Sequence, residues 1–392
     1  MSQTETMILN MGPQHPSTHG VLRLILELDG ERVVSARPDI GFLHSGIEKT
    51  GEHRTYRQVL PYTDRMDYVS AMTHNLGYVL AVEKLLGIEV PLRTQYIRVI
   101  MAELSRIASH LIGIGSAALD LSGVSGVILM YCFWEREKIL NLFEAASGQR
   151  MSPSYFRIGG LMADLPEGWV EQARAFIAEF PKRVDDIEKV LTHNPIMLDR
   201  TVGIGVLSPE DAIAYGITGP SLRGSGVRYD VRKAMPYSGY DRFDFEVPVG
   251  KNGDVYDRYR VRVAELRQST HIIQQALDDL PDGPINVADR KVVLPPREEL
   301  DTSTEALIHQ FKLITEGLHP PAGQVFVSVE ASKGELGYYL VSDEGPKPYR
   351  FRVRTPSFAA VQVLPRLIQG GLLADVVAVI GSLDLVMGEV DR

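Results

Sequence analysis

Two histidines in a proline-rich segment are the first residues of this sequence that could carry chemistry. His15 and His19 stand four residues apart in the stretch Gly12-Pro-Gln-His-Pro-Ser-Thr-His-Gly20. An imidazole has an ordinary pKa of about 6.5, so it can transfer a proton near neutral pH or bind a metal ion. A histidine pair with this spacing binds zinc when both lie on one helix face, but Pro16 and the glycines indicate an irregular loop. An ordinary place in a turn is the simpler interpretation for both.

A carboxylate and a phenol are further candidates. Asp120 interrupts the apolar segment Ala117-Ala-Leu-Asp-Leu-Ser122. It either caps the end of a helix or forms half of a buried pair, because an unpaired buried charge is costly. Tyr68 lies one helical turn after Asp64 and can be a plain core residue. Neither residue defines a site by itself.

Common cofactor motifs are missing. Gly203-Ile-Gly205 begins a glycine pattern, but Ser208 stands where the third glycine of a dinucleotide site belongs, and no strand–helix–strand unit surrounds it. There is also no Gly-Lys-Ser/Thr phosphate loop. With Cys132 as the single cysteine, the chain can form neither an internal disulfide nor a four-thiolate metal or iron–sulfur site.

Charge and hydropathy exclude further classes of protein. The 392 residues contain 41 Lys and Arg against 50 Asp and Glu, a net charge of -9, which argues against nucleic acid as a partner. The N-terminus lacks the basic flank and apolar core of a secretory signal. The most apolar uncharged stretch, 121–134, is shorter than the ~20 residues of a spanning helix. We therefore expect any membrane association to come through another protein.

The elements that must position these residues are mostly helices. Residues 21–28 alternate like a strand, and Asp29-Gly30 predicts a hairpin turn into a return strand from Arg32. Asp64 is a plausible N-cap for a helix that continues to Gly87. Apolar spacing and stop signals predict further helices over 91–111, 130–147, 166–193, 259–280 and 303–317, two short helices near the C-terminus, and strands over 325–329, 336–341 and 349–353.

This order predicts an α+β fold that is predominantly α, without the strand–helix alternation of a doubly wound sheet. The four long helices before residue 200 suggest a central bundle. We expect an N-terminal β region with the histidine loop (1–60), a core helical bundle (61–200), and a loop-rich α+β region (201–392). The last region contains a small antiparallel sheet and returns the C-terminus to the core.

Long motifs then give a specific resemblance. The segment Met11-Gly-Pro-Gln-His-Pro-Ser-Thr-His-Gly-Val-Leu-Arg23 closely resembles the opening signature of the 49 kDa (D) subunit of respiratory complex I, the NADH–quinone oxidoreductase. The likeness continues through 41–49, 52–56, 62–68, 98–106, 229–233, 236–240, 334–339 and 382–392, so it spans nearly the whole chain.

That family is related to the large subunit of nickel–iron hydrogenases, whose fold the resemblance implies here. The hydrogenase pattern Arg-x-Cys-Gly-x-Cys-x-x-x-His falls on Arg65 to His74, and the C-terminal pattern Asp-Pro-Cys-x-x-Cys-x-x-His falls on Asp384 to Arg392. The thiolate positions are then Asp67, Ser70, Val386 and Glu389. Soft nickel needs sulfur ligands that these residues cannot supply, so we expect no metal and no hydrogen turnover.

In the resembling family the cavity holds a quinone headgroup. The resemblance implies that His19 and Tyr68 hydrogen-bond the two quinone oxygens, with Met66 and Val386 as apolar wall. It also implies that Asp120 pairs with His19. Asp120 and Asp67 would both lie behind the residues that contact the quinone and assist proton transfer. Arg65 would lie near the iron–sulfur cluster of the neighbouring B subunit and favour its reduced form by charge.

Three departures from the family pattern stand out. Ser152 occupies a position where relatives often have a histidine that couples cluster reduction to protonation, so that coupling is not supported here. Leu385 replaces the usual proline of the C-terminal motif, and residues 123–133 depart from the usual aromatic-rich pattern. None of these positions is His19 or Tyr68.

The resemblance implies a quinone-site subunit of a proton-pumping NADH:quinone oxidoreductase. The chain would carry no redox cofactor of its own, take ubiquinone or menaquinone as substrate, and contact the B, C, I and H subunits. It would be peripheral, on the cytoplasmic face of the inner membrane. Two alternatives stay open: a non-catalytic scaffold with the hydrogenase-like fold, and the equivalent subunit of a related dehydrogenase with another electron donor.

Overall fold

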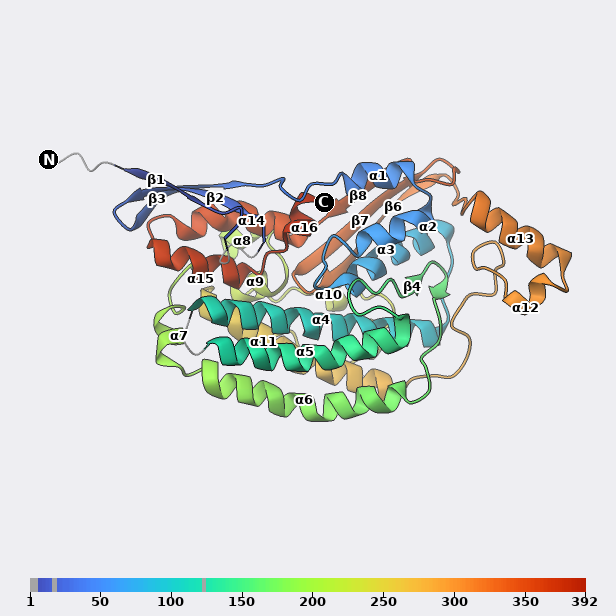
Figure 1. The fold of residues 1–392 in the computed structure, drawn as a ribbon, viewed down its shortest axis with the longest axis horizontal. Helices are drawn as coiled ribbons and strands as arrows, with labels where there is room; N and C mark the ends of the chain where they lie inside the picture. Colours follow the sequence, from blue (N-terminus) through green and yellow to red (C-terminus); the bar gives the residue numbers. More distant parts are fainter. Residues whose placement is uncertain (1–5, 16–19, 122–124) are drawn as a thin grey trace.

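The computed structural model describes residues 6–15, 20–121 and 125–392. A layer of long helices lies beneath a second layer that contains two small sheets and the shorter helices around them (Figure 1). The expected fold class is confirmed: the chain is mostly helical, with a three-stranded antiparallel sheet near each end of the sequence.

Four helices make up the bundle, in which α4 packs against α5 and α11, and α6 packs against α5 and α11. They are α4 (Leu92–Leu121), α5 (Ser125–Ser147), α6 (Trp169–Leu191) and α11 (Val255–Asp278). The expected bundle differs in one helix: α3 (Ala71–Leu86), the helix before Gly87, contacts α4 but packs mainly on the C-terminal sheet, and α11 takes the fourth place in the bundle. Its surface is buried almost all round, which fits a helix held between a sheet and a bundle.

The start of α3 also differs from the expectation. Asp64 does not cap α3, because α2 (Tyr56–Thr63) ends at this residue and turns follow to Ser70. The Asp67 carboxylate accepts hydrogen bonds from the backbone N–H groups of Val69 (3.0 Å) and Ser70 (3.1 Å). Aspartate stabilises turns in this way, so residues 65–70 form a turn segment rather than a first helical turn.

The two sheets bring distant parts of the chain together. The N-terminal sheet has the order β1-β2-β3, from Met7–Met11, Arg23–Asp29 and Arg32–Asp39. The C-terminal sheet has the order β6-β7-β8, from Gly323–Ala331, Gly334–Ser342 and Arg350–Arg354, with Phe326 opposite Tyr339 and Val327 opposite Tyr338. All pairs are antiparallel, as the sequence predicts for β2 with β3 and for the C-terminal sheet.

Shorter elements complete the fold. They are α1 (Ile47–His53), β4 (Phe156–Arg157), β5 (Gly160–Leu161), α7 (Pro195–Asp199), α8 (Pro209–Ala214), α9 (Gly219–Gly224), α10 (Val231–Ala234), η2 (Tyr240–Arg242), α12 (Arg297–Leu300), α13 (Thr304–Thr315), α14 (Pro356–Ile368), α15 (Leu373–Leu383) and α16 (Met387–Asp391). The α12–α13 pair projects from the body (Figure 1). Within the described ranges, no helix combines the length and the apolar character that crossing a membrane requires.

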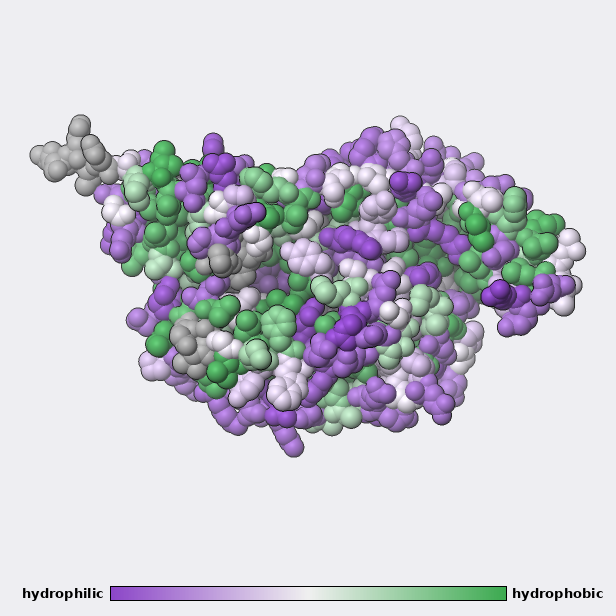
Figure 2. Space-filling model, viewed as in Figure 1, coloured by the Kyte–Doolittle hydropathy of each residue, from purple (hydrophilic) through white to green (hydrophobic). Residues whose placement is uncertain are grey.

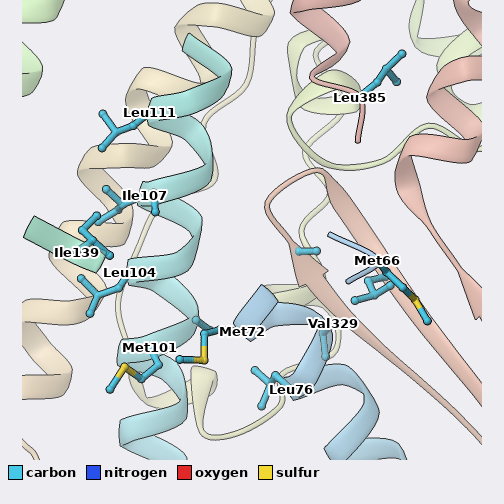
Figure 3. Packing of buried hydrophobic residues seen from close by; sticks show 14 of the residues in the cluster. Met66, Met72, Leu76, Met101, Leu104, Ile107, Leu111, Ile139, Val329 and Leu385 are labelled. Atoms are coloured by element: carbon cyan, nitrogen blue, oxygen red, sulfur yellow. The ribbon is translucent and has the colours of Figure 1, made fainter. Parts of the chain in front are cut away.

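The apolar core lies where α4 meets its neighbours. Leu104, Ile107 and Leu111 project from α4 and Ile139 from α5 beside them, while Met72 and Leu76 come from α3 (Figure 3). All are at most 1% exposed. This packing fixes α3 relative to α4, and therefore fixes the turn segment that precedes α3.

A buried network of charged groups also ties the bundle to the C-terminal sheet. Arg106 of α4 donates to the backbone oxygens of Ala331 (2.9 Å) and Glu330 (2.6 Å), at the turn between β6 and β7. Its Nε also donates to Glu103 (3.2 Å), which stands one turn earlier on α4. The hairpin is thus bonded to α4 through side chains that stand on a single helix face.

Candidate functional site

The candidate site forms where three separate segments meet. They are the turn segment Arg65–Ser70, the first turn of α3, and α16 close to the C-terminus. Adding a Cβ to Gly388 of α16 would bring it 2.6 Å from the Met66 backbone oxygen and 3.3 Å from Tyr68 Cε1. Glycine is therefore required at position 388, because any side chain would separate α16 from the turn segment.

Asp67, His74 and Glu389 form a fully buried triad at this meeting point. One ligand-type atom from each residue lies within 4.8 Å of the others. His74 Nε2 is 3.2 Å from Glu389 Oε2, and the Tyr338 hydroxyl is 3.3 Å from His74 Nδ1. When the hydroxyl donates to Nδ1, Nε2 carries the ring hydrogen and donates to Glu389, so both nitrogens are satisfied.

Glu389 is held by backbone groups around the start of α14. Its Oε1 accepts a hydrogen bond from the Ser357 N–H (2.9 Å), and the Thr355 hydroxyl donates to the Glu389 backbone oxygen (2.8 Å). The start of a helix favours a negative charge, which explains how a carboxylate can be buried here.

Asp67 is less well satisfied than Glu389. Its Oδ1 accepts two backbone hydrogen bonds, but its Oδ2 is buried and has no hydrogen-bond partner among the described residues. Burial and the nearby Glu389 raise the pKa of Asp67, although Lys333 and His74 oppose that rise. A carboxyl in this position has a strong tendency to hold a proton.

Tyr68 is the member of the site that reaches the surface, with 38% of its area exposed. Burial of the rest, together with the charges of Asp67 and Glu389, raises the pKa of its phenol above the ordinary value. Tyr68 therefore keeps its proton near neutral pH and can donate a hydrogen bond to an outside group. The recess beside it, which Ser152 and Arg136 also line, has a volume of about 10 Å³.

Two buried charged residues hold α16 and the chain before it in place. The Lys333 ammonium forms a salt bridge with Asp384 and donates to the Ser109 hydroxyl (3.0 Å) on α4. Asp384 lies so close to α4 that a Cβ on Gly113 would be 2.9 Å from its carboxylate. Burial acts to raise the pKa of Asp384, but Lys333 and Arg262 overcome this and lower it, so the carboxylate stays charged.

Arg65 stands at the outer side of the site, with 59% of its side chain exposed. Its guanidinium donates to the Pro61 backbone oxygen (2.6 Å) and lies 3.7 Å from Asp64 Oδ2. Burial raises the pKa of Asp64 to about 8, against the opposing effects of Arg65, Asn75 and Arg157. At neutral pH the Asp64 carboxyl is thus largely protonated, and Arg65 presents a positive charge at the surface.

Sequence comparisons identify the family to which this site belongs. The sequence profile described as respiratory-chain NADH dehydrogenase, 49 Kd subunit, matches residues 123–392. The chain belongs to this family. It is 56% identical over 392 residues, the full length of both chains, to the D subunit of the NADH-quinone oxidoreductase of Geotalea uraniireducens. It is also 56% identical to a D 2 subunit of the same enzyme from Koribacter versatilis, over all of this chain and 97% of the relative, and 55% identical along the full length to the D subunit from Geobacter sulfurreducens.

The structure brings together several of the residues predicted for a quinone site in this family. Tyr68, Asp67 and Met66 lie in one turn segment, with Met66 fully buried. Val386, 3% exposed, precedes α16 on the other side of the same meeting point. Asp120 lies in the last turn of α4, while His19 lies outside the described residues.

The other side of the predicted histidine loop does reach the site. Gly20, the next residue after His19, lies against Met387: a Cβ there would be 3.3 Å from Met387 Cγ. Met387 immediately precedes Gly388, which contacts the turn segment. Gly20 and Tyr68 therefore lie against consecutive residues of α16.

Sequence reasoning assigned no role to His74, Lys333, Tyr338 or Asp384. The motifs did contain a signal for two of them, since His74 and Asp384 end and begin the hydrogenase patterns. Lys333 and Tyr338 belong to the β6–β7 hairpin, and nothing in their local sequence indicates that they reach a site formed about 260 residues earlier.

Asp67, His74 and Glu389 are the described residues with donors arranged for a metal ion. Two carboxylates and an imidazole suit a harder divalent cation such as zinc or manganese, whereas nickel of the hydrogenase type requires thiolates. The Lys333 charge, which acts on Asp67, opposes binding of any cation. That this family member holds no metal in the cavity stays a prediction.

Proposed function

We propose that this chain, a subunit of a NADH-quinone oxidoreductase of the complex I type, holds the quinone headgroup while the quinone is reduced. The proposal rests on one observation, which is the position of Tyr68. It is a phenol with a raised pKa, exposed at the surface, and supported from behind by the buried Asp67–His74–Glu389 triad.

The chemistry of quinone reduction explains what Tyr68 would do. The quinone gains two electrons and two protons to become a quinol, and negative charge develops on its two oxygens. A hydrogen-bond donor at each oxygen stabilises that charge. The phenol of Tyr68 would donate at one oxygen, and it would release its proton only as the quinone becomes more basic.

His19 is proposed for the other oxygen, with Asp120 as its partner. The contact of Gly20 with Met387 supports this, because Gly20 follows His19 in the sequence and Met387 precedes Gly388, which lies close to Tyr68. An imidazole can transfer a proton near neutral pH, so His19 would protonate the quinone more readily than Tyr68.

A second chain must enclose the headgroup. The recess beside Tyr68 has room for about one water molecule, far less than a quinone ring requires. The headgroup would therefore lie against the exposed side of Tyr68, and Met66 and Val386 are the residues that we propose as its apolar wall. We propose that the B subunit covers it there and that the positive charge of Arg65 faces the iron–sulfur cluster of that neighbour.

The surface fits a chain that is covered by partners on several sides. Apolar side chains are exposed on α13 at the projecting end and along one face of α5 (Figure 2). They are Leu307, Ile308, Phe311 and Ile314 on α13, and Val127, Met130, Tyr131 and Trp134 on α5. Large exposed apolar areas commonly mark protein interfaces. The B, C, I and H subunits, and a peripheral position on the cytoplasmic side of the inner membrane, are the partners and the place that we propose.

Replacing the phenol tests the proposal. Tyr68→Phe removes a hydrogen bond to an oxygen that becomes charged, worth about 1.5–3 kcal/mol, and should lower quinone reduction by the assembled complex about 10- to 100-fold. Both kcat and the apparent affinity for a short-chain quinone should be measured. Electron transfer from NADH to an artificial water-soluble acceptor should be unchanged, because that reaction does not need the headgroup site.

Tyr349→Phe is the matched control, since Tyr349 is 69% exposed and lies just before β8, outside the site described above. It should leave all rates unchanged. If Tyr68→Phe also leaves the quinone reductase rate and the apparent quinone affinity unchanged, Tyr68 does not belong to a quinone site and the proposal is wrong.

A further inference from the structure

The outer edge of β6 exposes main-chain groups with a definite direction. In an antiparallel pair, both backbone groups of a residue point either toward the partner strand or away from it, and the two directions alternate. The Lys84 ammonium donates to the Phe326 backbone oxygen (3.4 Å), and the Glu330 N–H donates to the Tyr237 hydroxyl oxygen (3.0 Å), so even-numbered residues of β6 point away from β7.

The neighbouring pair of strands confirms this parity. The Tyr349 N–H donates to the Val341 oxygen, which places the odd-numbered residues of β7 toward β8. The even-numbered residues of β7 must then face β6, and they stand opposite odd-numbered residues such as Val327, which lies opposite Tyr338. The backbone N–H and C=O groups of Phe326 and Ser328 therefore point away from β7, toward the open edge of the sheet.

This edge lies at the bottom of a groove of about 610 Å³. One wall is the end of α3 and the residues after it, and the other is the segment Met235–Ser238. Residues of both walls and of the edge line the groove: Leu80, Lys84, Ile88, Glu89, Met235, Tyr237, Ser238, Phe326, Val327 and Ser328. The Ser238 hydroxyl oxygen in this wall is buried and has no partner among the described residues.

We propose that an extended segment of another subunit of the complex lies in this groove and pairs with β6 as a fourth strand. Its main chain would bond the outward groups of Phe326 and Ser328, which is the usual way in which a peptide is added to a sheet edge. Four residues of a strand cover ~13 Å. The pairing would end near Glu330, because Tyr237 and Arg106 already occupy the backbone groups of that residue.

The walls of the groove decide what can occupy it. A second copy of this chain cannot bring its own β6 to this edge, because the same two walls surround the edge in both copies. A single extended segment can enter, since it needs only ~4.8 Å beside β6. Its side chains on one face would meet Leu80 and Ile88, which are apolar.

Lys84 adds a preference for a negatively charged residue in the added segment. Its ammonium is exposed and rests on the Phe326 oxygen, which an incoming strand would take over. Lys84 would then be released at the middle of the edge, and a carboxylate on the added segment would pair with it. The occupant is therefore an extended peptide that is apolar on one face and carries an acidic residue near its centre.

Amide hydrogen exchange in the assembled complex tests the pairing directly, with an internal control. Val327 is bonded within the sheet, whereas Phe326 and Ser328 point outward. If a strand is added, the amides of Phe326 and Ser328 should exchange about as slowly as that of Val327. If they exchange more than ~100-fold faster, the edge is open and the proposal is wrong.

Two further measurements identify what covers the edge. Ser328→Pro removes the outward N–H and blocks the edge while leaving the β6–β7 bonds in place, so the variant should lose one subunit from the complex. Ser328→Ala keeps the backbone and should assemble normally; an equal loss in both variants would overturn the proposal. Zero-length cross-linking should join Lys84 to a carboxylate of a different chain, and a link between two copies of this chain would contradict it. None of these results depends on whether Tyr68 contacts a quinone.

Discussion

Glu103 offers the sharpest quantitative test of how the site is held in place. Its carboxylate is fully buried on α4 and accepts four hydrogen bonds from side chains. The donors are Arg106 (3.2 Å), Arg232 (3.0 Å), Ser269 (2.6 Å) and Tyr240 (2.6 Å). Arg106 also donates to backbone oxygens at the end of β6. Glu103 therefore lies where the bundle contacts the sheet that carries Lys333 and Tyr338.

The pKa of Glu103 gives the size of the effect. Burial acts to raise this pKa, but Arg106 and Arg232, assisted by the two hydroxyl groups, lower it from 4.5 to about 2. At about 1.36 kcal/mol per pKa unit, that difference corresponds to a contribution of about 3 kcal/mol to the free energy of unfolding. Because the pKa in the folded chain is depressed, the contribution is complete above pH 4.5 and is lost as the pH falls toward 2.

Glu103→Gln should therefore lower the free energy of unfolding by about 3 kcal/mol at pH 7, because two arginines lose the charge that pairs with them. Urea unfolding of the full-length chain at several pH values measures this. The difference from wild type should shrink between pH 4.5 and 2, as wild type becomes protonated. Glu179→Gln is the control: Glu179 binds Lys138 and Arg183 at the surface and should contribute little. Equal stability of Glu103→Gln and wild type at pH 7, or a difference that does not change with pH, would refute the reasoning.

Four further predictions concern the site itself. Gly388→Ala should reduce quinone reduction by displacing Tyr68, although the phenol is retained; kcat in the assembled complex measures this, and an unchanged value would contradict the packing argument. Asp64→Asn should be as stable as wild type below pH 4 and more stable than wild type at pH 9. Because the pKa of Asp64 is raised to about 8 in the folded chain, wild type loses stability as the pH rises. Urea unfolding at both pH values measures the difference. His19→Ala should abolish quinone reduction without loss of assembly, whereas a scaffold would keep full turnover. Metal analysis of the purified chain should find no stoichiometric nickel or iron.

The sequence predicted the positions of the helices and strands better than it predicted which of them pack against each other. The helices that form α4, α5, α6, α11 and α13, and the strands β2, β3, β6, β7 and β8, follow the apolar periodicity to within a few residues at most ends, whereas β1 was not predicted. The start of α3 was misplaced because Asp64 looks like an N-cap, while its actual position is the end of α2. Both ends of a helix accept a short polar side chain, and local sequence does not distinguish them.

The bundle was misassigned for a related reason. Periodicity shows that a helix has an apolar face, but α3 and α11 both have buried faces, and only tertiary contacts decide which of them packs on α4 and α6. The choice depends on the β6–β7 hairpin, which covers α3 and comes from a part of the chain far away in sequence. Long-range pairing of this kind leaves no local signal.

The motif resemblance identified residues at the site itself but not the buried residues that hold them in place. Tyr68 and Asp67 were predicted because they stand in a motif with fixed spacing, whereas Glu389 was named only as a position where the hydrogenase pattern has a thiolate. Lys333 and Tyr338 were not found, although each contacts a site residue or its anchor: Tyr338 contacts His74, and Lys333 contacts Asp384. Their importance comes from burial, which turns ordinary side chains into the partners that a buried charge requires.

The triad brings two buried carboxylates and an imidazole close together. Burial makes it costly for the Asp67 and Glu389 carboxylates to be charged at the same time. Lys333 reduces that cost, and His74 provides a shared hydrogen between Nε2 and Glu389. A site built this way is best satisfied by one proton and one nearby cationic side chain, whereas a divalent ion would have to displace the proton and tolerate Lys333. Tyr68 is next to Asp67 in sequence and exposed on its outer side, so under the proposed function it is the group that would connect this pocket with the quinone.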